Sequence, residues 1–268
     1  MNAILTDTST TDILLHQQDG ILEISLNRPK ANAIDRATSR RLGEIFTAFR
    51  DSTELRVAIL RATGEKFFSA GWDLKAAASG EEVDGDYGIG GFGGLQELGQ
   101  MNKPVICAVN GICCGGGLEM ALACDLILAS DTASFALPEI RSGTVADAAS
   151  IKLPKRIPYH VAMDLLLTGR WFDAEEAHRW GLVKQIVSQD SLQQTAWELA
   201  RHLVSGPPLV FAAIKEVVRE AEDTKFQDML NRVTKRQLST VDTLYSSEDQ
   251  LEGARAFAEK RAPVWKGK

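Results

Sequence analysis

The sequence predicts an α/β fold followed by a helical C-terminal region. Between residues 13 and 206, short apolar runs typical of strands alternate with helical segments, which is the rhythm of repeated βα units. No strand-like run follows Ser205-Gly206-Pro207-Pro208. A chain of 268 residues, 44% apolar and 25% charged, suits one larger domain or one domain with an appendage. We expect a core over residues 1–206 and a helical region over 207–268.

The elements of the core follow from its apolar spacing. Residues 13–15 and Ile21–Leu26 flank Gln18-Asp19-Gly20, and the second run alternates apolar and polar side chains, which predicts a β-hairpin. Apolar residues at helical spacing predict a helix over residues 37–50. Further strands are expected at residues 55–60, Val105–Val109, 125–129 and 183–187.

The C-terminal region begins with Pro207 and Pro208, which suit the first turn of a helix. Its apolar stripes comprise Val210, Ile214, Val217 and Val218, then Met229, Leu230 and Val233. A helical appendage with no strand to cover must bury such stripes against the core or another subunit.

Composition excludes several classes of function. A net charge of −6 without a basic run argues against nucleic acid as partner. No apolar stretch approaches the ~18 residues of a membrane span, and residues 1–13 lack the pattern of a secretion signal. We therefore expect no membrane partner and a cytoplasmic location. The four cysteines have no Cys-x-x-Cys spacing and the four histidines are scattered, so we expect buried apolar thiols and no metal site.

Two short motifs suggest catalysis. Phe68-Ser69-Ala70-Gly71-Trp72-Asp73 and Gly115-Gly116-Gly117-Leu118-Glu119 each follow a strand-like run and place small residues where a backbone N–H could face a ligand. Two such groups converging on one carbonyl oxygen form an oxyanion hole, in which each donor is worth roughly 2.7–4 kcal/mol. The alternative is that the glycines only allow close helix packing.

Two carboxylates accompany these motifs. Glu119 lies near the start of a predicted helix, where an acidic residue is also a plain helix-start preference. Glu139 follows Pro138 and an apolar run, although a surface salt bridge is its alternative role. Around one water, one carboxylate can orient or deprotonate it while the other gives a proton to carbon. The combination predicts an enzyme that enolises a thioester.

These residues resemble a known family. The segments 27–33, 68–75, 103–111 and 115–119 are similar, in order, to the crotonase (enoyl-CoA hydratase/isomerase) superfamily, and the resemblance runs from about residue 13 to the C-terminus. It implies a spiral of ββα units with a C-terminal helical trimerisation region, and a homotrimer or hexamer. Segments 67–78, 135–139 and 256–267 look most like members that act on crotonobetainyl-CoA and carnitinyl-CoA.

The resemblance also implies residue roles. Ala70 and Gly116 would donate the two oxyanion N–H groups, Glu139 would be the principal acid/base at Cα, and Glu119 would hold water at Cβ. Because two close carboxylates cannot both ionise cheaply, we expect them to share a proton near neutral pH. The expected substrate and CoA contacts are Lys30, Ala31, Gly71, Trp72, Asp73, Leu74 and Lys260, with Lys75 and Arg261 as further phosphate contacts or solvated side chains.

The acyl end of the site is less determined. Trp72, Tyr87 and Phe92 offer aromatic faces for a trimethylammonium group, although each could equally pack in the core. Residues 143–150 depart from the family by lacking a proline and a Gly-Gly pair. There Asp147 could face a quaternary ammonium or cap the following helix.

The predicted activity is reversible hydration of a 2,3-unsaturated acyl-CoA, preferably crotonobetainyl-CoA, with no cofactor beyond the substrate's own coenzyme A. Alternatives are a general short-chain enoyl-CoA hydratase and a non-catalytic acyl-CoA-binding protein. A hydride-transferring oxidoreductase is a further one, since residues 88–93 match a dinucleotide fingerprint. That match lacks the required strand and helix, so we interpret it as coincidence.

Overall fold

The computed structural model describes residues 3–6, 11–82 and 85–268. Much of the N-terminal stretch that argued against a secretion signal therefore lies outside the described residues, and the cytoplasmic location stays a prediction. None of the helices in the described part of the chain is long and apolar enough to span a membrane.

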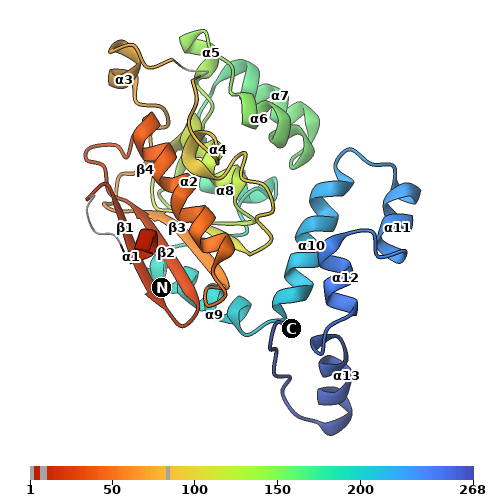
Figure 1. The fold of residues 1–268 in the computed structure, drawn as a ribbon. Coiled ribbons are helices and arrows are strands. Elements are labelled where there is room, and N and C mark those ends of the chain that lie inside the picture. Colours follow the sequence, from red (N-terminus) through yellow and green to blue (C-terminus); the bar gives the residue numbers. More distant parts are fainter. Residues whose placement is uncertain (1–2, 7–10, 83–84) are drawn as a thin grey trace.

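The larger sheet has six strands in the order β1-β2-β3-β5-β7-β10 (Figure 1). The predicted hairpin is confirmed, because β1 and β2 pair antiparallel with Ile13 opposite Leu26. All later pairs in this sheet are parallel. Its strands are β1 (Ile13–Gln18), β2 (Ile21–Leu26), β3 (Val57–Ala62), β5 (Val105–Val109), β7 (Leu126–Ser130) and β10 (Gln185–Val187).

A smaller sheet has the order β4-β6-β8-β9, in which the first three strands are parallel. Each of three successive turns of chain gives one strand to the larger sheet and the next to the smaller one before a helix follows. This confirms the predicted spiral of ββα units, whose short second strands were not located from apolar spacing. These strands are β4 (Phe67–Ser69), β6 (Ile112–Cys114), β8 (Ser134–Ala136) and β9 (Phe172–Asp173).

The central strands β2, β3, β5 and β7 are buried on both faces, which is why most of their residues are apolar, whereas the edge strands β1 and β10 are partly exposed. Alternate residues such as Val57 and Ile59 pack under α9 (Leu192–Val204), whereas Ala58 and Leu60 face the main core. Helix α2 (Arg36–Asp51) contributes Phe46 and Phe49 to that core. The other helices of this part are α1 (Ala3–Thr6), α3 (Leu74–Ala78), α4 (Gly116–Ala123), α5 (Glu139–Ser142), α6 (Asp147–Lys152), α7 (Tyr159–Thr168) and α8 (Ala174–Arg179).

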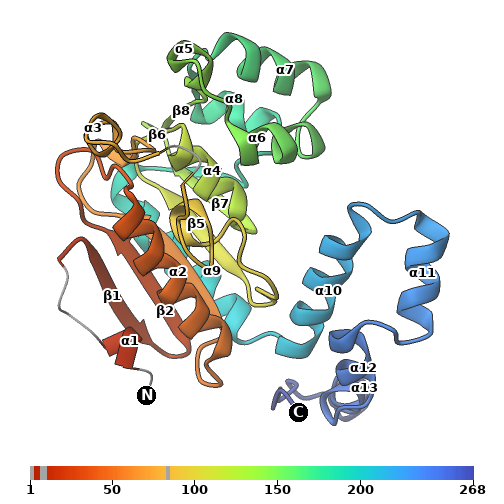
Figure 2. The same ribbon diagram turned by 45° about the horizontal axis from the view of Figure 1, so that its top comes forward.

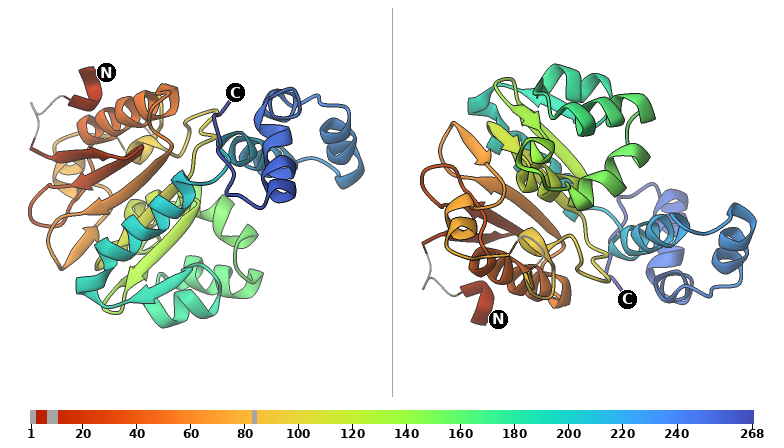
Figure 3. Two further views of the ribbon diagram at one scale, coloured as in Figure 1. Left: turned by 90° about the horizontal axis from the view of Figure 1, so that it is seen from below. Right: turned by 90° about the horizontal axis from the view of Figure 1, so that it is seen from above.

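Four helices follow Gly206 and project to one side of the core (Figures 2 and 3). Three of them share a small apolar cluster of their own that includes Ala213, Met229 and Val241. Large apolar side chains of this four-helix region stay exposed, including Phe226 on α11 at 79% and Phe257 on α13 at 87%. The helices are α10 (Pro208–Ala221), α11 (Phe226–Thr234), α12 (Ser239–Tyr245) and α13 (Asp249–Glu259).

Candidate active site

The two motifs and the Pro138-Glu139 pair singled out from the sequence follow three neighbouring parallel strands. Residues 70–73 follow β4, Gly115 and Gly116 follow β6, and Pro138 and Glu139 follow β8. The carboxyl ends of parallel strands meet at one edge of a sheet, where open α/β folds bind ligands. The fold thus brings together segments that lie about seventy residues apart in the sequence.

Close backbone approach joins the first two segments. Gly71 has φ +81°, and a Cβ there would lie 2.8 Å from both the Gly116 nitrogen and the Cys114 oxygen. Only glycine therefore fits, because a side chain would meet backbone atoms that cannot swing away. The same contact places the Gly116 N–H directly beside the turn that begins at Gly71.

The Gly116 N–H is available to a ligand. Gly116 opens α4, and the first bonds inside this helix run from the Leu118 and Glu119 N–H groups to the Gly115 oxygen. The leading N–H groups of a helix have no partner within it. Among the described residues, no acceptor faces the Gly116 N–H.

The prediction that Ala70 supplies the second N–H group of the oxyanion hole is wrong. The Ala70 N–H already donates to the Ala31 carbonyl at 2.9 Å, so it is not free for a substrate oxygen. The Gly71 N–H is also engaged, by the Ser69 Oγ at 3.1 Å. Sequence spacing could not reveal this, because the acceptors come from the loop after β2 and from β4 itself.

The neighbouring amide of Trp72 is the better candidate. Ile34 pairs with this segment by donating to the Gly71 oxygen and accepting from the Asp73 N–H, at 2.8 and 2.9 Å. Because consecutive amides of an extended segment point to opposite sides, the Trp72 N–H faces away from Ile34. No acceptor for it occurs among the described residues. The alternation of amides along this short bridge is the signal that the sequence interpretation missed.

Aromatic side chains border the Gly116 amide. The Phe92 ring fills the space beside Gly116, where a Cβ would lie 2.3 Å from its Cε1. Tyr87 packs edge-on against Phe92 with ring centroids 5.4 Å apart. The loop that carries them, including residues 88–93, has no strand before it in the described part and ends in a short 3₁₀ turn, η1 (Phe92–Gly94). This backbone lacks the context of a dinucleotide fingerprint.

Glu119 is a buried carboxylate to which the described residues offer one hydrogen-bond donor. Its side chain leaves 6% exposed, and Oε1 accepts from the Ala149 N–H at 2.9 Å. The pKa of Glu119 is raised to about 7, mainly because burial disfavours the charged form, while the charges of Asp147 and Glu139 add to the rise and the Ala149 hydrogen bond opposes it. Ala149 belongs to the segment that departs from the family pattern, so the departure directly touches this carboxylate.

Glu139 lies beside the same glycine turn. A Cβ on Gly115 would be 2.9 Å from its Oε1, and its buried Oε2 has no hydrogen-bond partner in the described part of the chain. Burial raises the pKa of Glu139 above its ordinary value, and the charge of Asp147 adds to the effect. Two poorly compensated carboxylates with raised pKa values at one strand edge are suited to proton transfer near neutral pH.

Asp147 is exposed and forms the first residue of α6, whose N-cap is Ala146. The expectation that Asp147 caps this helix is therefore wrong in detail, although its Oδ1 does accept from the adjacent Ala148 N–H at 2.7 Å. Its charge acts on both Glu119 and Glu139.

The residues expected to contact CoA are only partly brought together. Lys30 is exposed and lines a hollow of about 350 Å³ with Asn32 and Phe67. Asp73 is occupied within the protein, since it caps α3 and pairs with Arg28. Leu74 is 69% exposed. Lys260 is the C-cap of α13 in the C-terminal arm, and within this chain α13 lies far from β4 and α4, which border the candidate site (Figure 1).

The prediction that the cysteine thiols are buried is confirmed. All four are buried, and burial together with the charge of Glu139 raises the pKa of Cys114 to about 11. Its thiol is therefore neutral beside the site. Among the described residues, no three His, Cys, Asp or Glu side chains gather as metal ligands do.

A family model described as enoyl-CoA hydratase/isomerase matches residues 16–268. The chain belongs to the enoyl-CoA hydratase/isomerase family. The family fold is also seen in solved relatives. An enoyl-CoA hydratase from Mycobacterium tuberculosis H37Rv is 39% identical with a TM-score of 0.87, covering 97% of this chain and all of that one. A probable enoyl-CoA hydratase/isomerase from Mycobacterium abscessus is 40% identical with a TM-score of 0.85 over the same shares.

Relatives of this family member with closer sequences carry a more specific name. The carnitinyl-CoA dehydratase of Citrobacter koseri is 53% identical over 249 residues, which cover 92% of this chain and 95% of that protein. The carnitinyl-CoA dehydratase of Escherichia coli K12 is 51% identical over 255 residues, covering 95% and 98%. Both the family and the subfamily resemblance drawn from the sequence are thereby confirmed.

Proposed function

We propose that this family member reversibly hydrates a 2,3-unsaturated acyl-CoA thioester, with the crotonobetainyl-CoA/carnitinyl-CoA pair as preferred substrate. The observation that carries the reaction type is the meeting of free backbone donors with Glu119 and Glu139 at one strand edge. The names of the relatives that are 51–53% identical support the choice of acyl group.

The proposed oxyanion hole consists of the Trp72 and Gly116 N–H groups. Both are without an acceptor among the described residues, and Gly71 joins their two segments by backbone contact. Hydrogen bonds to the thioester oxygen withdraw electrons from the conjugated double bond, so that Cβ becomes open to water and the enolate is stabilised. The positive end of α4 adds to this effect at Gly116.

The two carboxylates divide the work on water. Glu119, which keeps its proton up to about pH 7, holds the water at Cβ. The Glu139 carboxylate takes a proton from that water as the hydroxyl bonds to Cβ, and delivers this proton to Cα. The elements of one water molecule are thereby added across the double bond, and both carboxyl groups return to their starting states.

We also propose that the reaction needs no cofactor beyond the substrate's coenzyme A. Addition of water to an activated double bond requires acid–base groups and a polarised carbonyl, and both are supplied by the residues above. Lys30 at its exposed hollow is the proposed phosphate contact of the nucleotide.

A homotrimer or hexamer is proposed for the assembly. The exposed apolar residues of the C-terminal arm support it, since they include Ile214, Val218, Phe226 and Phe257, each more than half exposed. A second copy that covers them would also allow Lys260 to reach a neighbouring site.

A panel of enoyl thioesters tests the function. The conjugated thioester absorbs in the ultraviolet and loses this band on hydration, so crotonyl-CoA and crotonobetainyl-CoA can be followed alike. We expect turnover of both and a higher kcat/KM for crotonobetainyl-CoA. Equal or lower kcat/KM for crotonobetainyl-CoA would favour a general short-chain hydratase. CoA binding without turnover of any enoyl thioester would favour a binding protein.

A further inference from the structure

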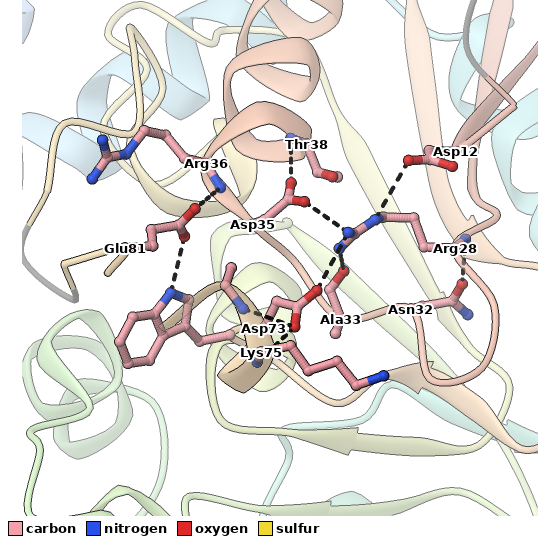
Figure 4. A network of polar contacts seen from close by, with 12 residues as sticks. Asp12, Arg28, Asn32, Ala33, Asp35, Arg36, Thr38, Asp73, Lys75 and Glu81 are labelled. Atoms are coloured by element: carbon pink, nitrogen blue, oxygen red, sulfur yellow. Dashed lines mark hydrogen bonds and ion pairs between the residues drawn. The ribbon is translucent and has the colours of Figure 1, made fainter. Parts of the chain in front are cut away.

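The guanidinium group of Arg28 contacts acceptors with all three of its nitrogens, beside the proposed oxyanion hole (Figure 4). It lies in the loop after β2, and its side chain is 19% exposed. One terminal nitrogen donates to Asp35 Oδ2 at 2.7 Å and to Asp73 Oδ2 at 3.3 Å. The other donates to the Ala33 carbonyl, and Nε lies 3.5 Å from the Asp12 carboxylate.

The partners of Arg28 flank the bridge that orients Trp72. Ala33 and Asp35 stand on either side of Ile34, whose backbone holds Gly71 and Asp73. Asp73 directly follows Trp72 on the opposite strand. One guanidinium therefore ties both strands of this isolated bridge together, at the residues that border its two hydrogen bonds.

A second set of hydrogen bonds holds the Trp72 side chain. Its indole Nε1 donates to Glu81 Oε1 at 3.1 Å, and Glu81 Oε2 accepts from the Arg36 N–H at 3.1 Å. Arg36 is the first residue of α2, next to the N-cap Asp35 that Arg28 binds. Both sets of contacts thus anchor the Trp72 segment to the start of the same helix, as Figure 4 shows for Arg28, Asp35 and Glu81.

We propose that Arg28 is a positioning residue, which fixes the direction of the Trp72 N–H without touching the substrate. The proposal rests on the oxyanion hole of the proposed function. A planar guanidinium can bind three acceptors in fixed directions, which an ammonium group cannot do. Displacement of a catalytic donor by about 1 Å can cost ~10²-fold in rate, so the set of its hydrogen bonds matters more than its charge.

The competing explanation is a purely structural role. Asp35 caps α2 and Asp73 caps α3, so loss of their common partner could simply weaken the fold. A matched control exists in Arg61 on β3, whose guanidinium lies 3.4 Å from the buried Glu23 and whose side chain is 26% exposed. Arg61 serves an ion pair within the larger sheet, away from the proposed site, and its side chain is nearly as buried as that of Arg28.

The experiment compares Arg28→Lys with Arg61→Lys and with Asp73→Asn, which keeps an acceptor for the α3 cap. The measurements are kcat and KM for crotonobetainyl-CoA, and the thermal midpoint of unfolding. A further one is the absorbance of bound p-dimethylaminocinnamoyl-CoA, which moves to longer wavelength when its carbonyl accepts hydrogen bonds. We expect Arg28→Lys to lower kcat by ~10²-fold with KM changed less than about threefold, and to reduce the absorbance shift. Asp73→Asn should lower kcat by ~10-fold, and Arg61→Lys should keep both readouts.

Wild-type kcat and absorbance shift in Arg28→Lys would overturn the proposal. So would a loss of kcat that Arg61→Lys shares in proportion to its fall in thermal midpoint. The chromophore separates this failure from failure of the proposed function. If the wild-type protein hydrates no enoyl-CoA, a shift that weakens in Arg28→Lys still supports the positioning role, and an unchanged shift refutes it.

Discussion

Two carboxylates of this protein are equally buried but differ in the hydrogen-bond donors and positive charges that surround them. Glu23 on β2 and Glu119 on α4 are both 6% exposed. Glu23 accepts from the Trp197 indole at 2.6 Å, lies 3.4 Å from the Arg61 guanidinium and also accepts from the Gln193 amide. Among the residues that the structure describes, Glu119 accepts from one backbone amide, that of Ala149.

The difference teaches that burial by itself does not mark a catalytic acid. The region under α9 meets the acceptor capacity of its carboxylate, so Glu23 fastens the helix to the sheet. At the strand edge, Glu119 and Glu139 have too few hydrogen-bond donors to compensate for their burial, as the raised pKa of Glu119 and the unpartnered Oε2 of Glu139 show. A buried polar group without a partner calls for an explanation, and a catalytic role is one such explanation when the group lies beside a ligand site and its pKa is shifted.

The largest expected effect separates the two regions by activity. Glu139→Gln removes the group that takes and returns the proton, so kcat for an enoyl-CoA should fall by ~10²–10⁴-fold. Glu23→Gln should leave kcat within a few-fold of wild type, because it lies on the other face of the larger sheet. Both are measured at saturating substrate, and wild-type turnover by Glu139→Gln would refute its assignment.

Removing the charge of Glu119 and removing the charge of Glu23 should change the free energy of unfolding at pH 8 in opposite directions. The pKa of Glu119 rises from an ordinary 4.5 to about 7 in the folded protein. Between these pH values the unfolded chain releases a proton that the folded chain keeps, so the free energy of unfolding falls with pH. The loss reaches roughly 3 kcal/mol above pH 7.

Glu119→Gln keeps an acceptor for Ala149 and cannot ionise. We therefore expect it to keep only a small residual activity yet to be more stable than wild type at pH 8, with the difference in stability vanishing near pH 4.5. Glu23→Gln should be less stable at both pH values by about 1–3 kcal/mol, because its amide disturbs buried donors. Urea unfolding at the two pH values measures this, and a destabilised Glu119→Gln at pH 8 would contradict the comparison.

The pH dependence of activity should reflect the titration of Glu119 and Glu139. If Glu119 works in its protonated form, kcat/KM should fall about tenfold per pH unit above about 7. This fall at high pH reports the joint titration of Glu119 and Glu139. It should therefore be absent from the residual activity of Glu119→Gln and retained in Glu23→Gln. A profile that is flat from pH 6 to pH 9 in the wild-type protein would sink this assignment.

The smallest expected effect concerns two tryptophans that each donate to a glutamate. Trp72, half-buried, donates to Glu81, whereas Trp197, 8% exposed, donates to Glu23. If the Trp72 ring receives the trimethylammonium group, Trp72→Leu should lower the preference for crotonobetainyl-CoA over crotonyl-CoA by about 2- to 30-fold. Trp197→Leu should reduce the thermal midpoint of unfolding and leave the preference unchanged. An unaltered preference in Trp72→Leu would place the head group elsewhere.

Much of the fold could be predicted because it depends on local patterns. The turn at Gln18-Asp19-Gly20, the apolar spacing of α2 and the buried strand Val105–Val109 all appear where the sequence indicates them. The short strands β4, β6 and β8 could not be found in this way, since three residues carry no periodicity. Their existence was implied by the family resemblance alone.

The sequence by itself determined the types of group at the site: glycines that admit close backbone approach, and two acids placed after strands. Tertiary structure decided which of these groups are free to act. It occupied the Ala70 N–H with the Ala31 carbonyl, left the Trp72 N–H facing away from Ile34, and met Glu119 with the Ala149 amide. Hydrogen-bond availability depends on partners that come from distant segments, and no pattern along one strand records them.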